Sequence, residues 1–314
     1  MSISALLLAA DGRRNESLSG LSGIIGLAAT ETLLRAVSRL DRTQHYKYFP
    51  PAFQRAIAEV AQKYDEAVAR QALSFSMWNA LVETLRSDSL QLLPIRIQRH
   101  QLVQFRRILD AQYESDDWLS LESDLFHKDF GIASLRLYAA AAQLVDPACG
   151  VPRSVVFRAG ILRIPAAVAA IASVKGFSPM FQIHTHLRYL DEFNVEGWNE
   201  CYRACADLYS VHPTSLGMYG GSWFYDPVVS SISPRLSYLS VVPKSGGAHF
   251  LLGARQGHFV DDAISTSPSR RKLFEEGKYN PRSFYMIWGR HDQSAWAAKN
   301  QIPIKAPSDR KSVV

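Results

Sequence analysis

The sequence predicts an α+β protein, in which a helical N-terminal part is followed by a mixed sheet with helices packed on it. Apolar side chains recur at three- and four-residue steps through residues 30–113, which is the spacing of a buried helix face. After the acidic connector 114–117, short β-type segments alternate with helical ones, as is typical of an α/β or α+β layer. We therefore expect a helical N-terminal region over residues 1–125, an α/β domain over residues 126–300 and a flexible basic tail over residues 301–314.

The composition indicates a folded and mildly basic protein. Of 314 residues, 47% are hydrophobic and 20% are charged, and 35 Lys and Arg against 29 Asp and Glu give a net charge of +6. Three of the basic residues, Lys305, Arg310 and Lys311, lie in the tail. The remaining excess is too small and too dispersed to bind a phosphate backbone, so we expect no nucleic-acid partner.

The cysteines and the apolar segments predict a cytoplasmic protein. Cys149, Cys201 and Cys205 are an odd number at irregular spacing, which suits a reducing compartment better than a disulfide framework. The apolar residues 5–10 are not preceded by the basic segment of a signal peptide. Each apolar segment is shorter than the roughly 20 residues that span a membrane, so we expect no membrane partner.

The first part contains two clear helical patterns. One follows Pro50 and Pro51 and runs through residues 57–72. The other begins near Pro94 and leaves four arginines mostly outward: Arg96, Arg99, Arg106 and Arg107. This basic face is either solvated, or it binds an anion or docks a partner.

The second part contains β-type and helical segments in alternation. Strands are expected at residues 155–158, 181–187, 216–225, 249–253 and 283–288. Helices are expected at residues 165–174, 195–211 and 268–276. In the second of these helices Asn194 is a suitable N-cap, and Cys201 and Cys205 both face the core, either as a metal or redox pair or as two packed thiols.

The segment 181–192 carries the most informative polar pattern. Because side chains alternate along a strand, one face would be entirely polar, with Gln182, His184, His186 and Arg188. Two carboxylates, Asp191 and Glu192, follow directly, and α/β proteins commonly place their sites at the carboxyl end of a strand.

Three interpretations of these histidines stay open. His184 and His186 could bind one divalent metal, with a third ligand from a set chosen by residue type alone: Asp191, Glu192, Asp226, His249 and His258. Without a metal, a histidine oriented by a carboxylate is a competent general base near neutral pH. In the third interpretation they form hydrogen bonds on an exposed strand face and have no chemical role.

The segment 217–227 combines glycines with aromatic residues. Gly220 and Gly221 indicate a bulge or a close backbone approach, and the strand ends at Tyr225 and Asp226. A single strand–helix–strand crossover would bring these two residues to the sheet edge that carries the histidines. The segment therefore predicts either a pocket wall or an aromatic core followed by a turn aspartate.

A third segment, 265–279, predicts a short helix capped by Ser267, with Pro268 at its first position and Gly277 at its end. Arg270 and Arg271 lie in its first turn, where the helix dipole disfavours cations, so a bound phosphate would relieve a local cost. The alternative is a solvated cap with surface arginines.

This last segment is similar to the closing helix and strand of GNAT-type acyltransferases. In that family a short helix that ends in a glycine and an aromatic residue precedes the next strand, as residues 273–279 precede 283–288 here. The strand–helix–strand pattern of residues 181–225 resembles the cofactor-binding unit of the family, which implies a coenzyme A thioester. The family's Arg/Gln-x-x-Gly-x-Gly/Ala loop does not occur in residues 190–197.

The leading hypothesis is a small-molecule enzyme that transfers an acyl group from a phosphate-bearing carrier such as coenzyme A. One histidine would act as general base, Tyr225 would protonate the leaving thiolate and the Ser267 helix would hold phosphate. The candidate catalytic residues are His184, His186, Glu192, Tyr225 and Asp226. The candidate cofactor-binding residues are Ser267, Ser269, Arg270, Arg271 and Arg188.

Two rival functions are kept beside this hypothesis. One is a metal-dependent hydrolase or oxygenase, with His184 and His186 as ligands of a divalent metal. The other is a non-catalytic protein that senses a metabolite or docks a partner. A small-molecule substrate is expected under the enzymatic hypotheses, and a homo-oligomer is compatible with all of them.

Overall fold

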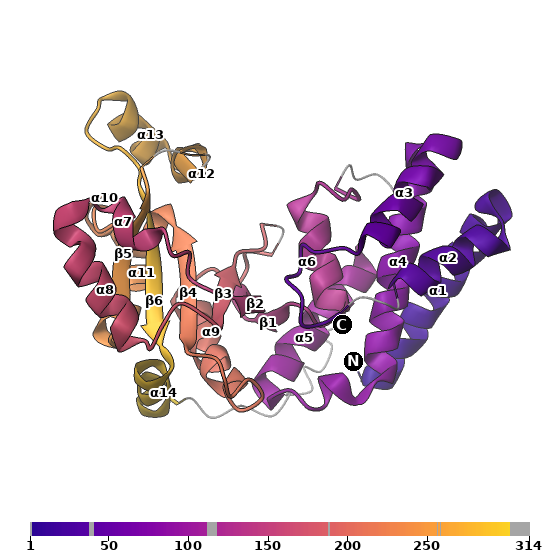
Figure 1. The fold of residues 1–314 in the computed structure, drawn as a ribbon, viewed down its shortest axis with the longest axis horizontal. Helices are drawn as coiled ribbons and strands as arrows, with labels where there is room; N and C mark the ends of the chain where they lie inside the picture. The colour runs from indigo at the N-terminus through magenta and orange to yellow at the C-terminus, as the bar shows by residue number, and fades with distance from the viewer. Residues whose placement is uncertain are drawn as a thin grey trace, which may run out of the picture.

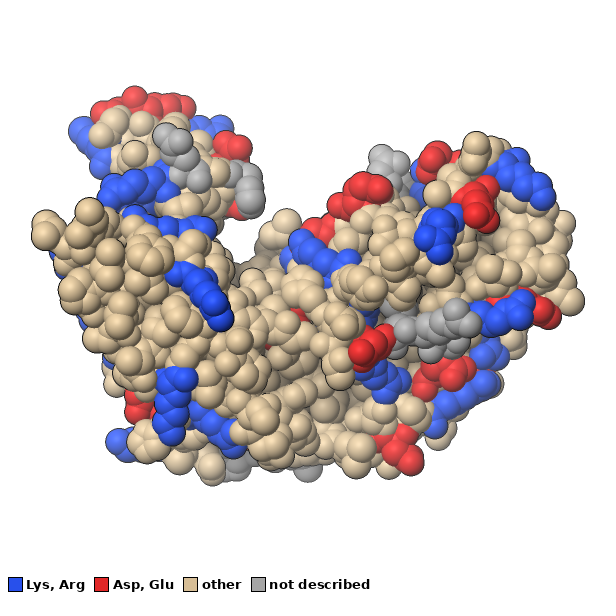
Figure 2. Space-filling model, viewed as in Figure 1, with Lys and Arg blue, Asp and Glu red and all other residues tan. Residues whose placement is uncertain are grey.

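The protein is an α+β protein with two halves, and a wide hollow separates their upper parts. The computed structural model describes residues 2–37, 41–111, 118–187, 189–255, 257 and 259–301. Figure 1 shows a helical half formed by the N-terminal helices and a second half built around a sheet. Figure 2 shows the hollow between them, and β1, β2 and β3 lie at its floor. The fold class predicted from the sequence is confirmed.

The helical half is organised around one central helix, α4 (Glu66–Arg86), against which α1 and α3 pack. Asp65 caps this helix by accepting a hydrogen bond from the Val68 amide at 2.8 Å. The prolines act as predicted, since α3 and α5 begin directly after Pro50 and Pro94. The other helices of this half are α1 (Ile3–Ile25), α2 (Leu27–Val37), α3 (Pro51–Lys63), α5 (Ile95–Asp110) and α6 (Asp124–Ala133).

The second half contains a six-stranded mixed sheet with the strand order β1-β2-β3-β4-β6-β5. Only β3 and β4 pair in parallel among the described strands, and α9 connects them. The strands are β1 (Tyr138–Ala140), β2 (Gln143–Cys149), β3 (Met180–His184), β4 (Gly217–Ser222), β5 (His249–Ala254) and β6 (Ser283–Gly289). The helices are α7 (Val155–Arg158), α8 (Ile164–Ser173), α9 (Val195–Leu208), α10 (Val229–Ile232), α11 (Tyr238–Ser245), α12 (Phe259–Ser265), α13 (Pro268–Glu275) and α14 (Arg290–Lys299).

The two faces of the sheet are covered by different helices. On one face, Trp198 and Tyr202 of α9 pack with Met218 and Trp288 of the sheet, in a buried cluster that continues into the helical half. On the other face, α7 and α8 form a smaller apolar cluster that includes Tyr219. The first cluster therefore joins the two halves across the boundary predicted near residue 125.

Cys201 and Cys205 are fully buried free thiols on the core side of α9, so they are packed thiols rather than a disulfide. Gln301 is the last described residue, and the rest of the basic tail predicted at 301–314 lies outside the described residues. None of the described helices is both long and apolar enough to cross a membrane.

Two local predictions were wrong, and one hairpin was missed. The single helix expected through residues 57–72 is divided, because α3 ends at Lys63 and α4 begins at Glu66 after its cap Asp65. Residues 155–158 form the helix α7 and not a strand, because a turn at Pro152 and a glycine at 160 leave room for one helical turn, which buries Val155 and Val156. The hairpin β1–β2 was not predicted, because its strands are short and alanine-rich and contain a single aromatic and a single β-branched residue, Tyr138 and Val145.

Candidate functional site

The parallel strands β3 and β4 pair with each other over only a short stretch. Their ladder covers only two residue pairs, Phe181 with Met218 and Gln182 with Tyr219. Beyond these pairs, β3 goes on pairing with β2 as far as His184, and β4 goes on pairing with β6 as far as Ser222. The carboxyl ends of the two strands are therefore not paired with each other beyond Gln182 and Tyr219. We call this unpaired stretch the gap, and in it the Ile183 side chain lies against Gly220.

Tyr225 lies at this gap, in the 3-10 turn Trp223–Tyr225 that follows β4. A Cβ atom at Gly220 would lie 2.7 Å from Ile183 Cγ1 and 3.3 Å from Tyr225 Oη, so this hydroxyl is next to both strands. The ring is fully buried, and the hydroxyl has no hydrogen-bond partner in the described part of the chain. Burial raises the pKa of Tyr225 well above its ordinary value, so the phenol keeps its proton.

His184 and His186 do not share a strand face, which corrects the prediction from alternation. The strand ends at His184 and the chain then leaves the sheet, where Lys128 Nζ donates to the Thr185 carbonyl at 2.7 Å. The His184 ring packs against Tyr46 with centroids 5.0 Å apart. Burial, helped by the charge of Lys128, lowers the pKa of His184 to about 3, so this ring is neutral and a poor base.

His186 instead forms a buried dyad with Asp129 of α6. His186 Nε2 donates to Asp129 Oδ1 at 2.9 Å, and Arg107 of α5 also binds this carboxylate. Burial raises the pKa of Asp129, but the hydrogen bond from His186 and the charge of Arg107 outweigh it, and the pKa is lowered. The carboxylate therefore stays ionised and holds the imidazole in one orientation.

The two predicted carboxylates have different partners, and that of Glu192 lies 3.9 Å from His100 Nδ1. Asp226 is buried, binds Arg282 through both oxygens at 2.8 and 3.0 Å and accepts from the Val228 amide, as a turn aspartate does. The Glu192 carbonyl packs against Gly197 in the first turn of α9, where a Cβ would lie only 2.0 Å from it. The loop before α9 therefore covers this helix end.

The Ser267 helix lies away from β3 and its histidine. Helices α12 and α13 form a projection beyond the sheet, far from β3 (Figure 1). Ser267 caps the helix as predicted, but Arg270 is buried and bonds to Ser233 and Thr266, with its guanidinium 4.5 Å above the Trp223 ring. Ser269 bonds to Ser267 and Arg271 to the Ser265 carbonyl. The predicted common cleft with His184 is therefore wrong, because α13 lies far from β3 and the Arg270 side chain is buried against Ser233 and Trp223.

Arg188 and His258 lie outside the described residues, so the structure does not test the roles predicted for them. No protein-family model, no curated protein and no solved structure matches this chain. The function of this chain is therefore inferred from its own geometry.

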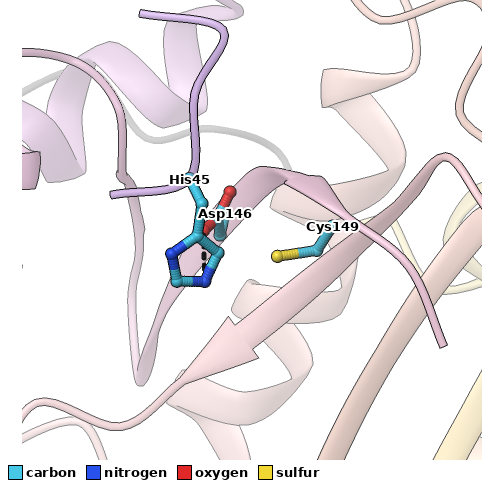
Figure 3. Close-up of side chains that lie close together, drawn as sticks. All are labelled: His45, Asp146 and Cys149. Atoms are coloured by element: carbon cyan, nitrogen blue, oxygen red, sulfur yellow. Dashed lines mark ion pairs between the residues drawn. The ribbon is translucent and has the colours of Figure 1, made fainter. Parts of the chain in front are cut away.

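A second polar cluster, which the sequence did not predict, lies on the other face of the sheet. Its members are His45, Asp146 and Cys149, whose ligating atoms all lie within 4.8 Å of one another (Figure 3). Asp146 and Cys149 are three residues apart and would point to opposite faces of a regular strand, but a register shift in β2 brings them together. His45 is about 100 residues distant in sequence, so only the fold reveals the cluster.

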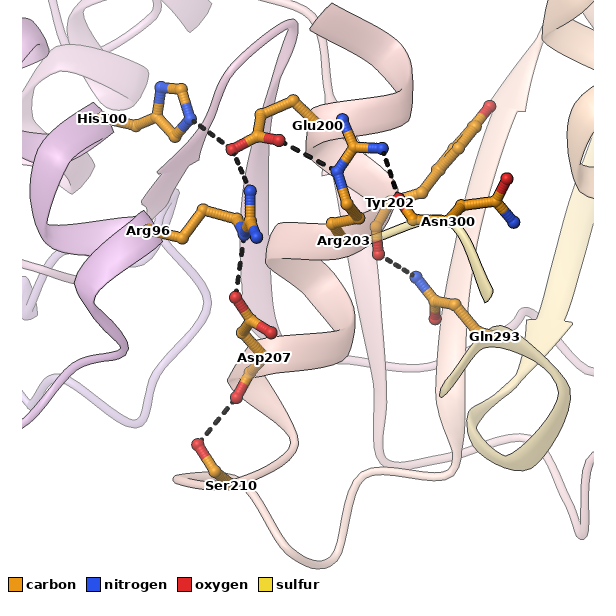
Figure 4. A network of polar contacts seen from close by, with 9 residues as sticks. All are labelled: Arg96, His100, Glu200, Tyr202, Arg203, Asp207, Ser210, Gln293 and Asn300. Atoms are coloured by element: carbon orange, nitrogen blue, oxygen red, sulfur yellow. Dashed lines mark hydrogen bonds and ion pairs between the residues drawn. The ribbon is translucent and has the colours of Figure 1, made fainter. Parts of the chain in front are cut away.

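The arginines of the basic face predicted on α5 have different surroundings: Arg106 is exposed, Arg107 binds buried Asp129, and Arg96 lies in an internal interface. Arg96 is buried and bonds to Glu200 and, at 2.9 Å, to Asp207, both on α9 (Figure 4). Arg203 of α9 binds the same glutamate at 3.0 Å. Arg96 therefore joins the helical half to the sheet half, and Arg203 holds the shared glutamate in place.

This network predicts an acid-sensitive interface. Burial raises the pKa of Glu200, but hydrogen bonds from His100, Arg96 and Arg203 outweigh it and lower the pKa to about 2, from an ordinary 4.5. The stabilisation is complete above pH 4.5 and is lost as the pH falls through the folded value. We expect the free energy of unfolding to fall from about pH 5 to pH 2 in urea titrations.

The matched variants are Glu200→Gln and, at an exposed position, Glu275→Gln. The first should flatten this acid limb of the stability profile, and the second should leave it unchanged. An acid limb of the same slope in Glu200→Gln would contradict the role of this network.

Proposed function

We propose that the protein is an acyltransferase that accepts a thioester carrier such as coenzyme A in the gap between β3 and β4. The observation that carries the proposal is the parting of these strands beside the unpartnered hydroxyl of Tyr225. The arm of coenzyme A that ends in the thiol contains amide groups, and an extended amide chain can bond to open strand edges. The gap therefore suits the carrier's reactive end.

The topology around the gap supports the same proposal. The strand–helix–strand unit β3–α9–β4 is the part of the chain that resembles the cofactor-binding unit of GNAT-type acyltransferases. The helix α13 ends at Glu275 and is followed by Gly277, with a φ of 68°, by buried Tyr279 and then by β6. This is the order of features on which the resemblance of the closing segment rests.

In the proposed reaction, His186 takes a proton from the amine or hydroxyl of the acceptor, and Asp129 stabilises the resulting imidazolium. The acceptor attacks the thioester carbonyl, a new bond to the carbonyl carbon forms and the carbon–sulfur bond breaks. Tyr225, whose phenol carries its proton at neutral pH, then gives that proton to the leaving thiolate.

The proposal differs from the sequence hypothesis in two respects. Ser267, Arg270 and Arg271 are not assigned to the carrier's phosphates, because they lie on the projection, far from β3, and Arg270 is buried against Ser233 and Trp223. His184 and His186 are not assigned to a metal, because the two rings have different partners. A small-molecule acceptor and a reducing, cytoplasmic environment belong to the proposal, in agreement with the free thiols.

Binding of coenzyme A tests the proposal. A ligand that binds only the folded protein adds roughly 2.7 kcal/mol to its stability at about 100 times the Kd, so coenzyme A and acetyl coenzyme A should raise the Tm. Gly220→Ala should weaken this binding about tenfold or more, because the new methyl group displaces Ile183 or Tyr225.

Gly221→Ala is the matched control. It adds the same methyl group one residue further along β4, against Tyr285 and on the other face of the sheet. It should strain the strand comparably and leave coenzyme A binding intact. An unchanged Tm of the wild-type protein at saturating coenzyme A would end the proposal, whereas binding without transfer to any acceptor would favour a metabolite sensor.

A further inference from the structure

Three metal-ligating side chains meet where the helical half touches β2. His45 comes from the segment between α2 and α3, and Asp146 and Cys149 come from β2 (Figure 3). His45 Nε2 lies 3.4 Å from Asp146 Oδ2, and the Cys149 sulfur points toward the imidazole. Imidazole, carboxylate and thiolate are the three side-chain ligands that zinc accepts.

The Asp146 carboxylate lacks compensation at one oxygen. Its side chain is fully buried; Oδ1 accepts from the Ala148 amide at 2.8 Å, and Oδ2 accepts no hydrogen bond from the described residues. Arg136 is close enough to act on this charge, but its guanidinium donates to Ser134 and to the Tyr48 carbonyl. The described contact of Oδ2 is the 3.4 Å approach of His45 Nε2, which is long for a hydrogen bond, so a bound cation would compensate this buried oxygen better.

The sheet register separates this cluster from the gap between β3 and β4. Asp146 lies opposite Gln182, and Gln182 lies opposite Tyr219, so these three side chains share one face of the sheet. Ile183 alternates to the other face, where Tyr225 packs. The cluster is therefore a distinct site, and its test does not depend on the proposed acyl transfer.

We propose that His45, Asp146 and Cys149 bind one zinc ion, which ties the segment before α3 to β2. The ligating atoms need to approach by less than about 2 Å to reach the ligand separations of a tetrahedral zinc site. His45 is partly exposed, with 39% of its side chain accessible, so the fourth coordination position is open to water. The zinc ion gives the thiol and the carboxylate a common positive partner.

Zinc binding would leave a local signature at His45. Its Nδ1 accepts a hydrogen bond from the Lys47 amide at 3.2 Å, which places the ring proton on Nε2. Coordination through Nε2 moves that proton to Nδ1, and Nδ1 can then no longer accept. The Lys47 amide should therefore report metal binding by a change in its NMR chemical shift.

The experiment titrates zinc chloride, and in parallel cobalt chloride, into the full chain after treatment with a chelator. We expect one ion per chain, a higher Tm with zinc and a thiolate-to-cobalt charge-transfer band. His45→Ala and Asp146→Asn should weaken zinc binding by a factor of roughly 100 or more. Cys149→Ser should remove the charge-transfer band.

The control is His291→Ala, which removes a histidine that also lies beside an aspartate, 3.0 Å from Asp292, but is 91% exposed and far from any cysteine in sequence. This variant should bind zinc as the wild type does. Substoichiometric zinc in the wild-type protein would overturn the proposal, as would unchanged binding in both His45→Ala and Cys149→Ser.

Discussion

Replacement of Tyr225 by phenylalanine is expected to lower the rate of acyl transfer by about 10²- to 10⁴-fold, the contribution of a general acid. The Tm should stay the same or rise, because the change removes a buried hydroxyl that has no partner among the described residues. The measurement combines transfer assays over a panel of amine and hydroxyl acceptors with thermal unfolding. A loss of activity without loss of stability separates a chemical role from a structural one.

Tyr202→Phe is the matched control for this prediction. Tyr202 is also fully buried with an unpartnered hydroxyl, but it lies on α9 and packs against Trp288 and Trp296. Its replacement should leave the transfer rate unchanged. Equal rates in wild type and Tyr225→Phe would remove Tyr225 from the mechanism, and equal losses in both variants would point to the packing of the core.

The second large effect is expected at Asp129. Asp129→Ala should lower the free energy of unfolding by about 3–5 kcal/mol, because it leaves Arg107 and buried His186 without their common carboxylate. Asp110→Ala breaks an exposed pair with Arg106, at 3.4 Å, and should cost less than about 1 kcal/mol. Urea unfolding of both variants measures the difference.

Asp129→Asn distinguishes the structural from the catalytic role of this side chain. The amide fills the same space but cannot stabilise a charged imidazolium, so transfer should fall even where the folded protein persists. A variant that folds and transfers at the wild-type rate would contradict the base assigned to His186. Stability equal to wild type in Asp129→Ala would contradict the buried ion pair itself.

The helices and the later strands could be predicted because their signals are local. Asn194 caps α9 by accepting from the Gly197 amide, and the helix buries the apolar stripe that its sequence repeats. The strands β5 and β6 also form close to their predicted positions. The hairpin β1–β2 has no comparable local signal, and its pairing with β3 depends on contacts between distant segments.

The candidate sites could also be predicted only where their signals are local. Tyr225 was predicted from its place at the end of a strand, but its position beside Ile183 requires the pairing of β3 with β4. His186 was predicted with His184, yet its partner Asp129 comes from a helix 57 residues earlier in the chain. From the sequence Arg96 was expected on the surface, and it is buried because α9 packs against α5. Alternation and periodicity describe a single strand or helix, whereas each of these contacts joins two elements that are distant in sequence.

The most direct measurement is an experimental structure of the protein with bound coenzyme A. We predict the amide-bearing arm between β3 and β4, bonded to the backbone of residues 183–184 and 220–222, with its sulfur next to Tyr225 Oη. Coenzyme A bound elsewhere, with Ile183 still lying against Gly220 across a closed gap, would contradict this account.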